Sequence, residues 1–193
     1  MKSVTAGWHI LHEANLASTV TGEKRAGHCV RSAPPRSYIH LTEGARLERT
    51  LVILKPNAVQ RELVGEIIAR FEKRGLRIAA LRMTVMTRAL AGQLYREHAG
   101  KPFYDDLVSF MTSGPLIVLV LEAEGAVRIV RSMVGATDPA DALPGTIRGD
   151  YATTAGHNMI HASDSAATAE REIALFFSPA DILEYSLAVK PWL

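Results

Sequence analysis

Cysteine is almost absent from this sequence, which has a single one, Cys29, among 193 residues. One cysteine excludes an intrachain disulfide and a cysteine-rich zinc site, so a reducing cytoplasm is the simplest predicted location. Long apolar runs are also missing. The longest candidate, residues 115–123, is far shorter than the ~20 residues that span a bilayer. It is typical of a buried strand, and we expect no membrane partner.

The sequence has little net charge of either sign. The formal total is +2, and residues 1–48 account for all of it with six Lys or Arg against four Glu, which leaves residues 49–193 neutral. Binding to nucleic acid depends largely on cations that neutralise phosphates. We therefore expect no specific nucleic acid among the partners.

Two common phosphate-binding motifs are missing as well. The sequence contains neither GxxxxGK[ST] nor the glycine-rich loop of protein kinases, both of which hold phosphates with backbone N–H groups. Any chemistry on a phosphate must use other groups.

The chain divides into an N-terminal arm and one domain. Residues 1–48 lack sustained periodicity and contain Pro34-Pro35, which predicts a poorly ordered arm. Two other interpretations of the arm remain open. It could be a transit peptide, which the four glutamates disfavour, or it could be sequence translated from a misassigned start. Residues 49–193 form the predicted domain.

Apolar periodicity predicts the elements of this domain. Strands are expected at 51–54, 76–87, 116–121 and 158–161, and helices at 59–74, 88–98, 103–111, 127–134 and from 163 or 164 through 177. Residues 135–156 are expected to be a long loop. Two split βαβ units predict an α+β fold, namely a ferredoxin-like antiparallel four-stranded sheet with helices packed on one face and a long loop before the last strand.

His161 is the residue most suggestive of chemistry. It ends a strand-like stretch, and Ser163 and Asp164 after it are good N-cap residues for the next helix. A helix N-terminus attracts phosphate, so we interpret His161 as a nucleophile for a phosphate. The alternative is a histidine that only satisfies a buried hydrogen bond.

Cationic and hydroxyl side chains accompany the long loop. Thr137 and Arg148 lie in it, Arg131 lies on the preceding predicted helix, and Lys55 follows the first strand. Guanidinium, ammonium and hydroxyl groups all donate to phosphate oxygens. The alternatives are solvated surface arginines and a lysine whose stem covers the strand end.

Four motifs together resemble the nucleoside diphosphate kinase family. They are RTLVILKP at 49–56, KPFY at 101–104, PGTIRGD at 144–150 and NMIHASD at 158–164. They occur in family order and at family spacing, and the resemblance covers residues 49–193.

The resemblance implies a ping-pong reaction. The γ-phosphoryl group of ATP passes to His161 as a phosphohistidine and then to another nucleoside diphosphate.

The resemblance also implies roles for other residues. Glu172 is implied to contact the second nitrogen of the imidazole. Groups implied around the phosphates are Lys55, Tyr95, Arg131, Thr137 and Arg148. Asn158 and Lys55 are implied at the sugar, and Phe103 and Leu107 at the base. The resemblance further implies Mg²⁺ as the cofactor, carried by the nucleotide phosphates, with no protein metal site. The family forms homo-oligomers, tetramers or hexamers.

The sequence departs from the family pattern at several positions. Ala162 stands where glycine is usual and is expected to crowd the nucleophile, so that restoring glycine raises turnover. Asn57 replaces a usual Asp, Glu62 a usual Gly and His157 a frequent Arg; we expect these to tune stability or assembly. A zinc site on His157 and His161, or a domain kept only for protein interactions, remain alternatives.

Overall fold

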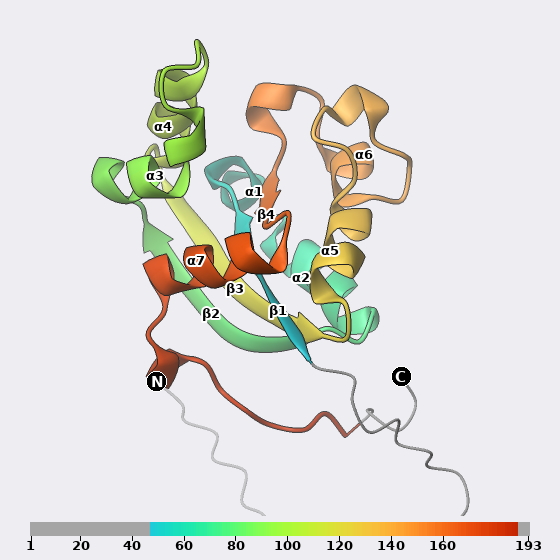
Figure 1. The fold of residues 1–193 in the computed structure, drawn as a ribbon. Coiled ribbons are helices and arrows are strands. Elements are labelled where there is room, and N and C mark those ends of the chain that lie inside the picture. The colour runs from blue at the N-terminus through green and yellow to red at the C-terminus, as the bar shows by residue number, and fades with distance from the viewer. Residues whose placement is uncertain (1–46, 189–193) are drawn as a thin grey trace, which may run out of the picture. The chain divides into compact units, whose positions relative to one another are not determined.

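The computed structural model describes residues 47–188, which form a four-stranded antiparallel sheet with strand order β2-β3-β1-β4 (Figure 1). The strands are β1 (Glu48–Leu54), β2 (Arg77–Val85), β3 (Pro115–Ala123) and β4 (Ile160–Ala162). This confirms the predicted α+β, ferredoxin-like fold. Of the predicted arm 1–48, residues 1–46 lie outside the described part of the chain.

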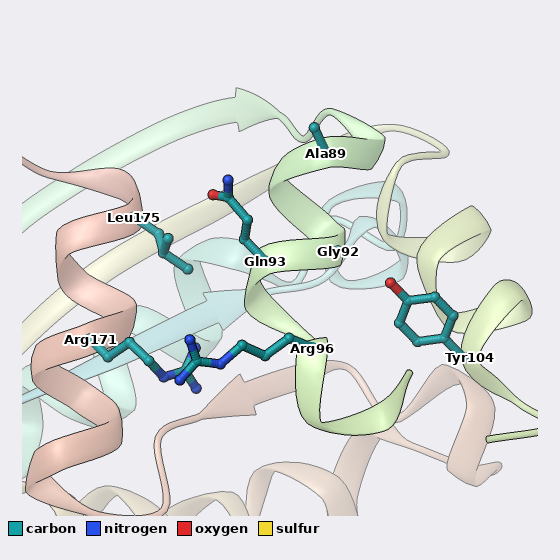
Figure 2. Close-up of a pocket in the computed structure, with 7 residues that line it drawn as sticks. All are labelled: Ala89, Gly92, Gln93, Arg96, Tyr104, Arg171 and Leu175. Atoms are coloured by element: carbon teal, nitrogen blue, oxygen red, sulfur yellow. The ribbon is translucent and has the colours of Figure 1, made fainter. Parts of the chain in front are cut away.

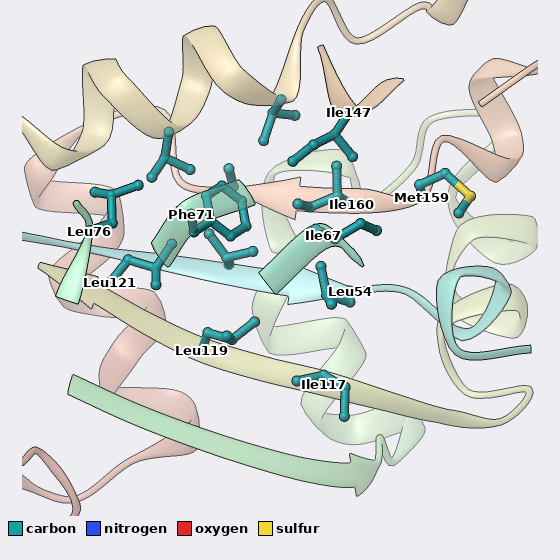
Figure 3. Packing of buried hydrophobic residues seen from close by; sticks show 14 of the residues in the cluster. Leu54, Ile67, Phe71, Leu76, Ile117, Leu119, Leu121, Ile147, Met159 and Ile160 are labelled. Atoms are coloured by element: carbon teal, nitrogen blue, oxygen red, sulfur yellow. The ribbon is translucent and has the colours of Figure 1, made fainter. Parts of the chain in front are cut away.

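Helices cover both faces of the sheet, so the expectation of helices on one face is wrong. Leu51 and Ile53 of β1 face a buried cluster with α3 (Arg88–Leu94), α4 (Tyr104–Met111) and α7 (Ala166–Phe176). Parts of α3, α4 and α7 are seen in Figure 2. Val52 and Leu54 face a second cluster with α2 (Val64–Lys73) and α5 (Ala126–Val134), shown in Figure 3. Successive residues of a strand point to opposite faces. A run of four consecutive apolar residues in β1 therefore requires cover on both.

The helix predicted over 59–74 is two helices, α1 (Pro56–Gln60) and α2. Pro56 begins α1, where its missing N–H costs nothing. Glu62, in the break, has φ 57, a left-handed conformation that favours glycine and interrupts helix geometry.

The segment predicted as a loop, 135–156, is not structureless. It contains a 3-10 turn at Pro139–Asp141, a five-residue helix α6 (Ile147–Tyr151) and a second 3-10 turn that starts at Ala155. Thr146 caps α6 by accepting a hydrogen bond from the N–H of Gly149, and Ile147 is fully buried. A helix of one turn is too short to leave an apolar period in the sequence.

Three other predicted boundaries shift. The helix predicted at 88–98 ends at Leu94 and continues as a 3-10 turn, Arg96–His98. β4 begins two residues later than predicted. The N-cap of α7 is Ser165, whose Oγ accepts a hydrogen bond from the N–H of Thr168. The sequence had predicted Ser163 or Asp164 at this position. No helix within residues 47–188 has the length and apolar character needed to cross a bilayer.

Candidate functional site

The register of β4 against β1 decides which way His161 points. His161 is paired with Ile53, whereas Ala162 is paired with Val52. Residues directly opposite in an antiparallel pair share a face, so the imidazole lies on the face covered by α3, α4 and α7. Lys55 is two residues beyond Ile53, and its N–H donates to the carbonyl of Met159 at 2.9 Å. The end of β1 is therefore joined to the segment that leads into His161.

A buried carboxylate holds one nitrogen of the imidazole. Nε2 of His161 lies 2.9 Å from Oε2 of Glu172 in α7, and Glu172 is only 2% exposed. Ser163 donates its hydroxyl to the same oxygen at 2.7 Å. A carboxylate oxygen accepts hydrogen bonds, so the neutral imidazole that fits this contact has its proton on Nε2 and a lone pair on Nδ1. Nδ1 makes no hydrogen bond to any residue between 47 and 188.

Tyr95 covers the other side of the histidine. Its ring meets that of His161 edge to face, with centroids 5.9 Å apart. Its hydroxyl is buried and has no hydrogen-bond partner in the described part of the chain. Burial, with a contribution from the charge of Glu172, raises the pKa of this phenol. The hydroxyl therefore stays protonated and has a free donor.

Lys55, Asn158 and Thr137 form a hydrogen-bonded chain. Nζ of Lys55 donates to Oδ1 of Asn158 at 2.6 Å, and Nδ2 of Asn158 donates to the carbonyl of Thr137 at 2.9 Å. Lys55 is 6% exposed. Burial, followed by the charge of Arg148, lowers the pKa of Lys55 to about 7. No carboxylate balances this ammonium within residues 47–188, so it is suited to an anion that arrives from solution.

Arg148 is mostly occupied by backbone carbonyls. Nε donates to the carbonyl of Asn158, Nη2 to that of Ile160, and Nη1 to those of Gly135 and Ala136. A guanidinium has five N–H donors, so one is left for a ligand. The predicted donation of Arg148 to a phosphate therefore depends on a single remaining N–H. The side chain mainly braces β4 against the loop while its charge stays in the site.

Arg131 and Thr137 lie on the same side as Arg148. Arg131 is half-buried in the last turn of α5, and its charge, after burial, lowers the pKa of Arg148 to about 10. Thr137 is exposed. Positive charge is thus concentrated where Lys55, Arg131 and Arg148 meet, with a hydroxyl at its edge.

Phe103 and Leu107 lie at the start of α4. Phe103 is 50% exposed, and Leu107 packs partly against the cluster under α3, α4 and α7. His98, which sequence reasoning missed, stacks on Tyr95 at 6.2 Å and meets Phe103 edge to face at 5.5 Å between centroids. An exposed aromatic ring held by other rings is suited to stack on a flat ligand.

Ser163 was also missed as a site residue, because its place near a helix start predicts a cap. No local pattern distinguishes a serine that caps a helix from one that holds a carboxylate nine residues away. The contact with Glu172 arises only when α7 folds back onto β4.

The crowding expected from Ala162 is contradicted. Its side chain belongs to the core under α2 and α5, on the opposite face from the imidazole, and no positive φ occurs at this position. The backbone there is ordinary strand, which alanine adopts freely.

The zinc alternative has no support in the geometry. His157 packs its ring against Phe110 with centroids 4.7 Å apart, whereas His161 faces Tyr95. Residues 47–188 contain no group of three or more side chains placed to hold a metal ion.

Comparison with known proteins agrees with this geometry. The family model described as nucleoside diphosphate kinase matches residues 48–182. A nucleoside diphosphate kinase of Methanococcoides burtonii is 55% identical over 147 residues, which cover 76% of this chain and 99% of that protein. One from Pyrococcus furiosus is 55% identical over 74% of this chain and 90% of its own length.

A solved structure gives the same result. The halophilic nucleoside diphosphate kinase from Halobacterium salinarum, determined in complex with CDP, superposes with a TM-score of 0.75 at 46% identity. The match covers 76% of this chain and 98% of that one. The chain belongs to the nucleoside diphosphate kinase family.

Proposed function

We propose that Nδ1 of His161 is the nucleophile with which this enzyme, a nucleoside diphosphate kinase, transfers phosphate between nucleoside triphosphates and diphosphates. The Nδ1 lone pair attacks the γ-phosphorus of ATP and forms an N–P bond. The bond between that phosphorus and the β–γ bridging oxygen breaks, and its electron pair leaves on ADP. A second nucleoside diphosphate then attacks the phosphohistidine and restores the free imidazole.

Glu172 is proposed to make this attack possible. The imidazole becomes positively charged as Nδ1 bonds to phosphorus, and the carboxylate 2.9 Å from Nε2 stabilises that charge. It also fixes the tautomer in which Nδ1 is unprotonated. The proton on Nε2 stays in place throughout the cycle.

Lys55, Arg131, Arg148, Thr137 and Tyr95 are proposed to bind the phosphates. Phosphoryl transfer depends mainly on positioning and on cations that absorb moving negative charge. Mg²⁺ is proposed as the cofactor and to arrive on the nucleotide phosphates, since such ions need few protein ligands.

Phe103, with Leu107 beside it, is proposed to take the base, and Lys55 and Asn158 the sugar hydroxyls. Stacking on an aromatic face does not read the donor and acceptor groups at a base edge. Broad base specificity follows, with ATP as donor and other nucleoside di- and triphosphates as partners. The reducing cytoplasm is the proposed location.

Two features of His161 carry this proposal: Nε2 contacts the buried Glu172, and Nδ1 has no hydrogen-bond partner among residues 47–188. The proposal is tested by incubating the protein with γ-labelled ATP and Mg²⁺ and then with GDP. We expect acid-labile label on the wild type that moves to GTP, and none on His161→Ala. An unlabelled wild type would indicate a domain kept for protein interactions, and labelling of His161→Ala would refute the assignment.

Self-association, as a tetramer or hexamer, is proposed from the exposed apolar side chains of the edge strand β2. β2 is an edge strand, and Leu81, Met83 and Val85 on it are 50–60% exposed. An edge strand with an apolar row readily pairs with a second copy of itself. Light scattering should give a smaller mass for Met83→Glu than for the wild type. An unchanged mass would place the interface elsewhere.

A further inference from the structure

A cleft outside the proposed catalytic site lies between α3, α4 and α7. Its volume is about 690 Å³, within the range of about 300–1,000 Å³ typical of small-molecule sites. Figure 2 shows Arg96, from the 3-10 turn that follows α3, and Arg171, from α7, extending toward one another, with Gln93 and Leu175 beside them. None of the residues assigned to the nucleotide lines this cleft.

The charge in the cleft is positive and only partly balanced. The lining residues include two arginines and no acidic side chain. Arg171 lies 3.4 Å from a carboxylate oxygen of Glu97, whose side chain is 63% exposed, and 3.7 Å from Oε1 of Glu172. Arg96 has no carboxylate within ion-pair distance between residues 47 and 188. Two adjacent guanidiniums with spare donors are suited to phosphate oxygens.

A glycine opens the cleft to a further donor. A Cβ at Gly92 would lie 3.3 Å from the hydroxyl of Tyr104, closer than side chains usually approach. The absence of a side chain therefore lets this hydroxyl share the lining with the amide of Gln93. Of these two neutral donors, the amide of Gln93 lies beside the arginines and adds hydrogen bonds for an oxygen-rich group.

Arg171 connects the cleft to the proposed catalytic histidine. Oε1 of Glu172 faces Arg171, while Oε2 holds Nε2 of His161. A phosphate bound in the cleft competes with Glu172 for the charge of Arg171. With less positive charge beside it, the carboxylate of Glu172 stabilises a positively charged imidazole more strongly.

We propose that this cleft binds a phosphate-bearing small molecule at Arg96 and Arg171, and that its occupancy reaches His161 through Arg171 and Glu172. The transmission rests on the proposed role of His161, whereas the binding does not. The phosphate can belong to an inorganic phosphate or to a nucleotide, and the experiment separates these sources.

The binding is tested by calorimetric titration of the full chain with pyrophosphate and, separately, with AMP. Arg96→Gln should bind one pyrophosphate fewer per chain than the wild type, with unchanged basal turnover. The matched control is Arg74→Gln, which removes an equal charge from the exposed end of α2 and should bind as the wild type does. If the binding of AMP is lost in Arg96→Gln, the ligand of the cleft is a nucleotide. If only the binding of pyrophosphate is lost, the ligand is inorganic phosphate. Equal binding by the wild type and Arg96→Gln overturns the proposal.

The transmission is tested on the pH profile of His161 labelling by γ-labelled ATP. Pyrophosphate should move the acidic limb of the wild-type profile to higher pH. Arg171→Gln should have that limb already displaced and insensitive to pyrophosphate. Binding without any displacement refutes the transmission. Absence of label at every pH refutes the phosphohistidine instead and leaves the binding result intact.

Discussion

Nucleotide binding should draw a proton from solution, because Lys55 is buried and no carboxylate among residues 47–188 pairs with it. Its pKa is lowered to about 7 from 10.5. At pH 8.5 about 97% of a group with this pKa is neutral. A polyphosphate in contact with Nζ restores the charged form, since an adjacent anion raises the pKa of an ammonium. About one proton is therefore taken up per nucleotide at pH 8.5, and much less at pH 6.

The measurement is calorimetry of Mg-ADP binding in several buffers of different ionisation enthalpy. The slope of binding enthalpy against ionisation enthalpy counts the protons taken up. The phosphates of ADP do not interfere, because their last pKa is about 6. Lys55→Met should reduce the slope to near zero, whereas Lys73→Met, at an exposed lysine of α2, should keep it. A wild-type slope near zero at pH 8.5, or one that persists in Lys55→Met, refutes the reasoning.

The same pKa makes the free protein more stable as pH rises. Between pH 7 and 10.5 the unfolded chain binds a proton at Lys55 that the folded chain does not, so this group adds stability with rising pH. The full difference of 10.5 against about 7 corresponds to about 5 kcal/mol at 1.36 kcal/mol per pKa unit, as an upper bound. Denaturant midpoints across this window should rise in the wild type more than in Lys55→Met.

Three further substitutions test other parts of the molecule. Glu172→Gln should lower the single-turnover rate of His161 phosphorylation by about 10–100-fold, with little change in nucleotide affinity. An unchanged rate would show that Glu172 has no role in the mechanism. Glu62→Gly should raise the free energy of unfolding by about 1 kcal/mol, because φ 57 strains any residue with a Cβ. The control Glu72→Gly, within α2, should lower the free energy of unfolding by a similar amount. A lower free energy of unfolding in both variants would show that the backbone at Glu62 is not strained. Ala162→Gly should lower stability by about 1 kcal/mol and leave turnover unchanged, and faster turnover would restore the crowding argument.

Much of the fold follows from local patterns in the sequence. The apolar runs of β1 and β3 require burial, and this predicts where the central strands lie. The positions of α4 and α5 follow from helical periodicity to within a residue or so. The break at Glu62 and the single turn of α6 were not predicted, because a positive φ on a glutamate and a helix of five residues leave no periodic signal.

The candidate site divides in the same way. The sequence by itself determined which chemical groups are present and the family they belong to, since four motifs in order carry His161, Lys55 and Arg148. Only the tertiary structure decided that Nε2 of His161, and not Nδ1, faces Glu172, that Ser163 holds Glu172, and that Arg148 keeps a single free donor. These depend on where α7 and the loop before β4 pack against the sheet. Hydrogen bonds between distant segments depend on that packing, which no local pattern of residues encodes.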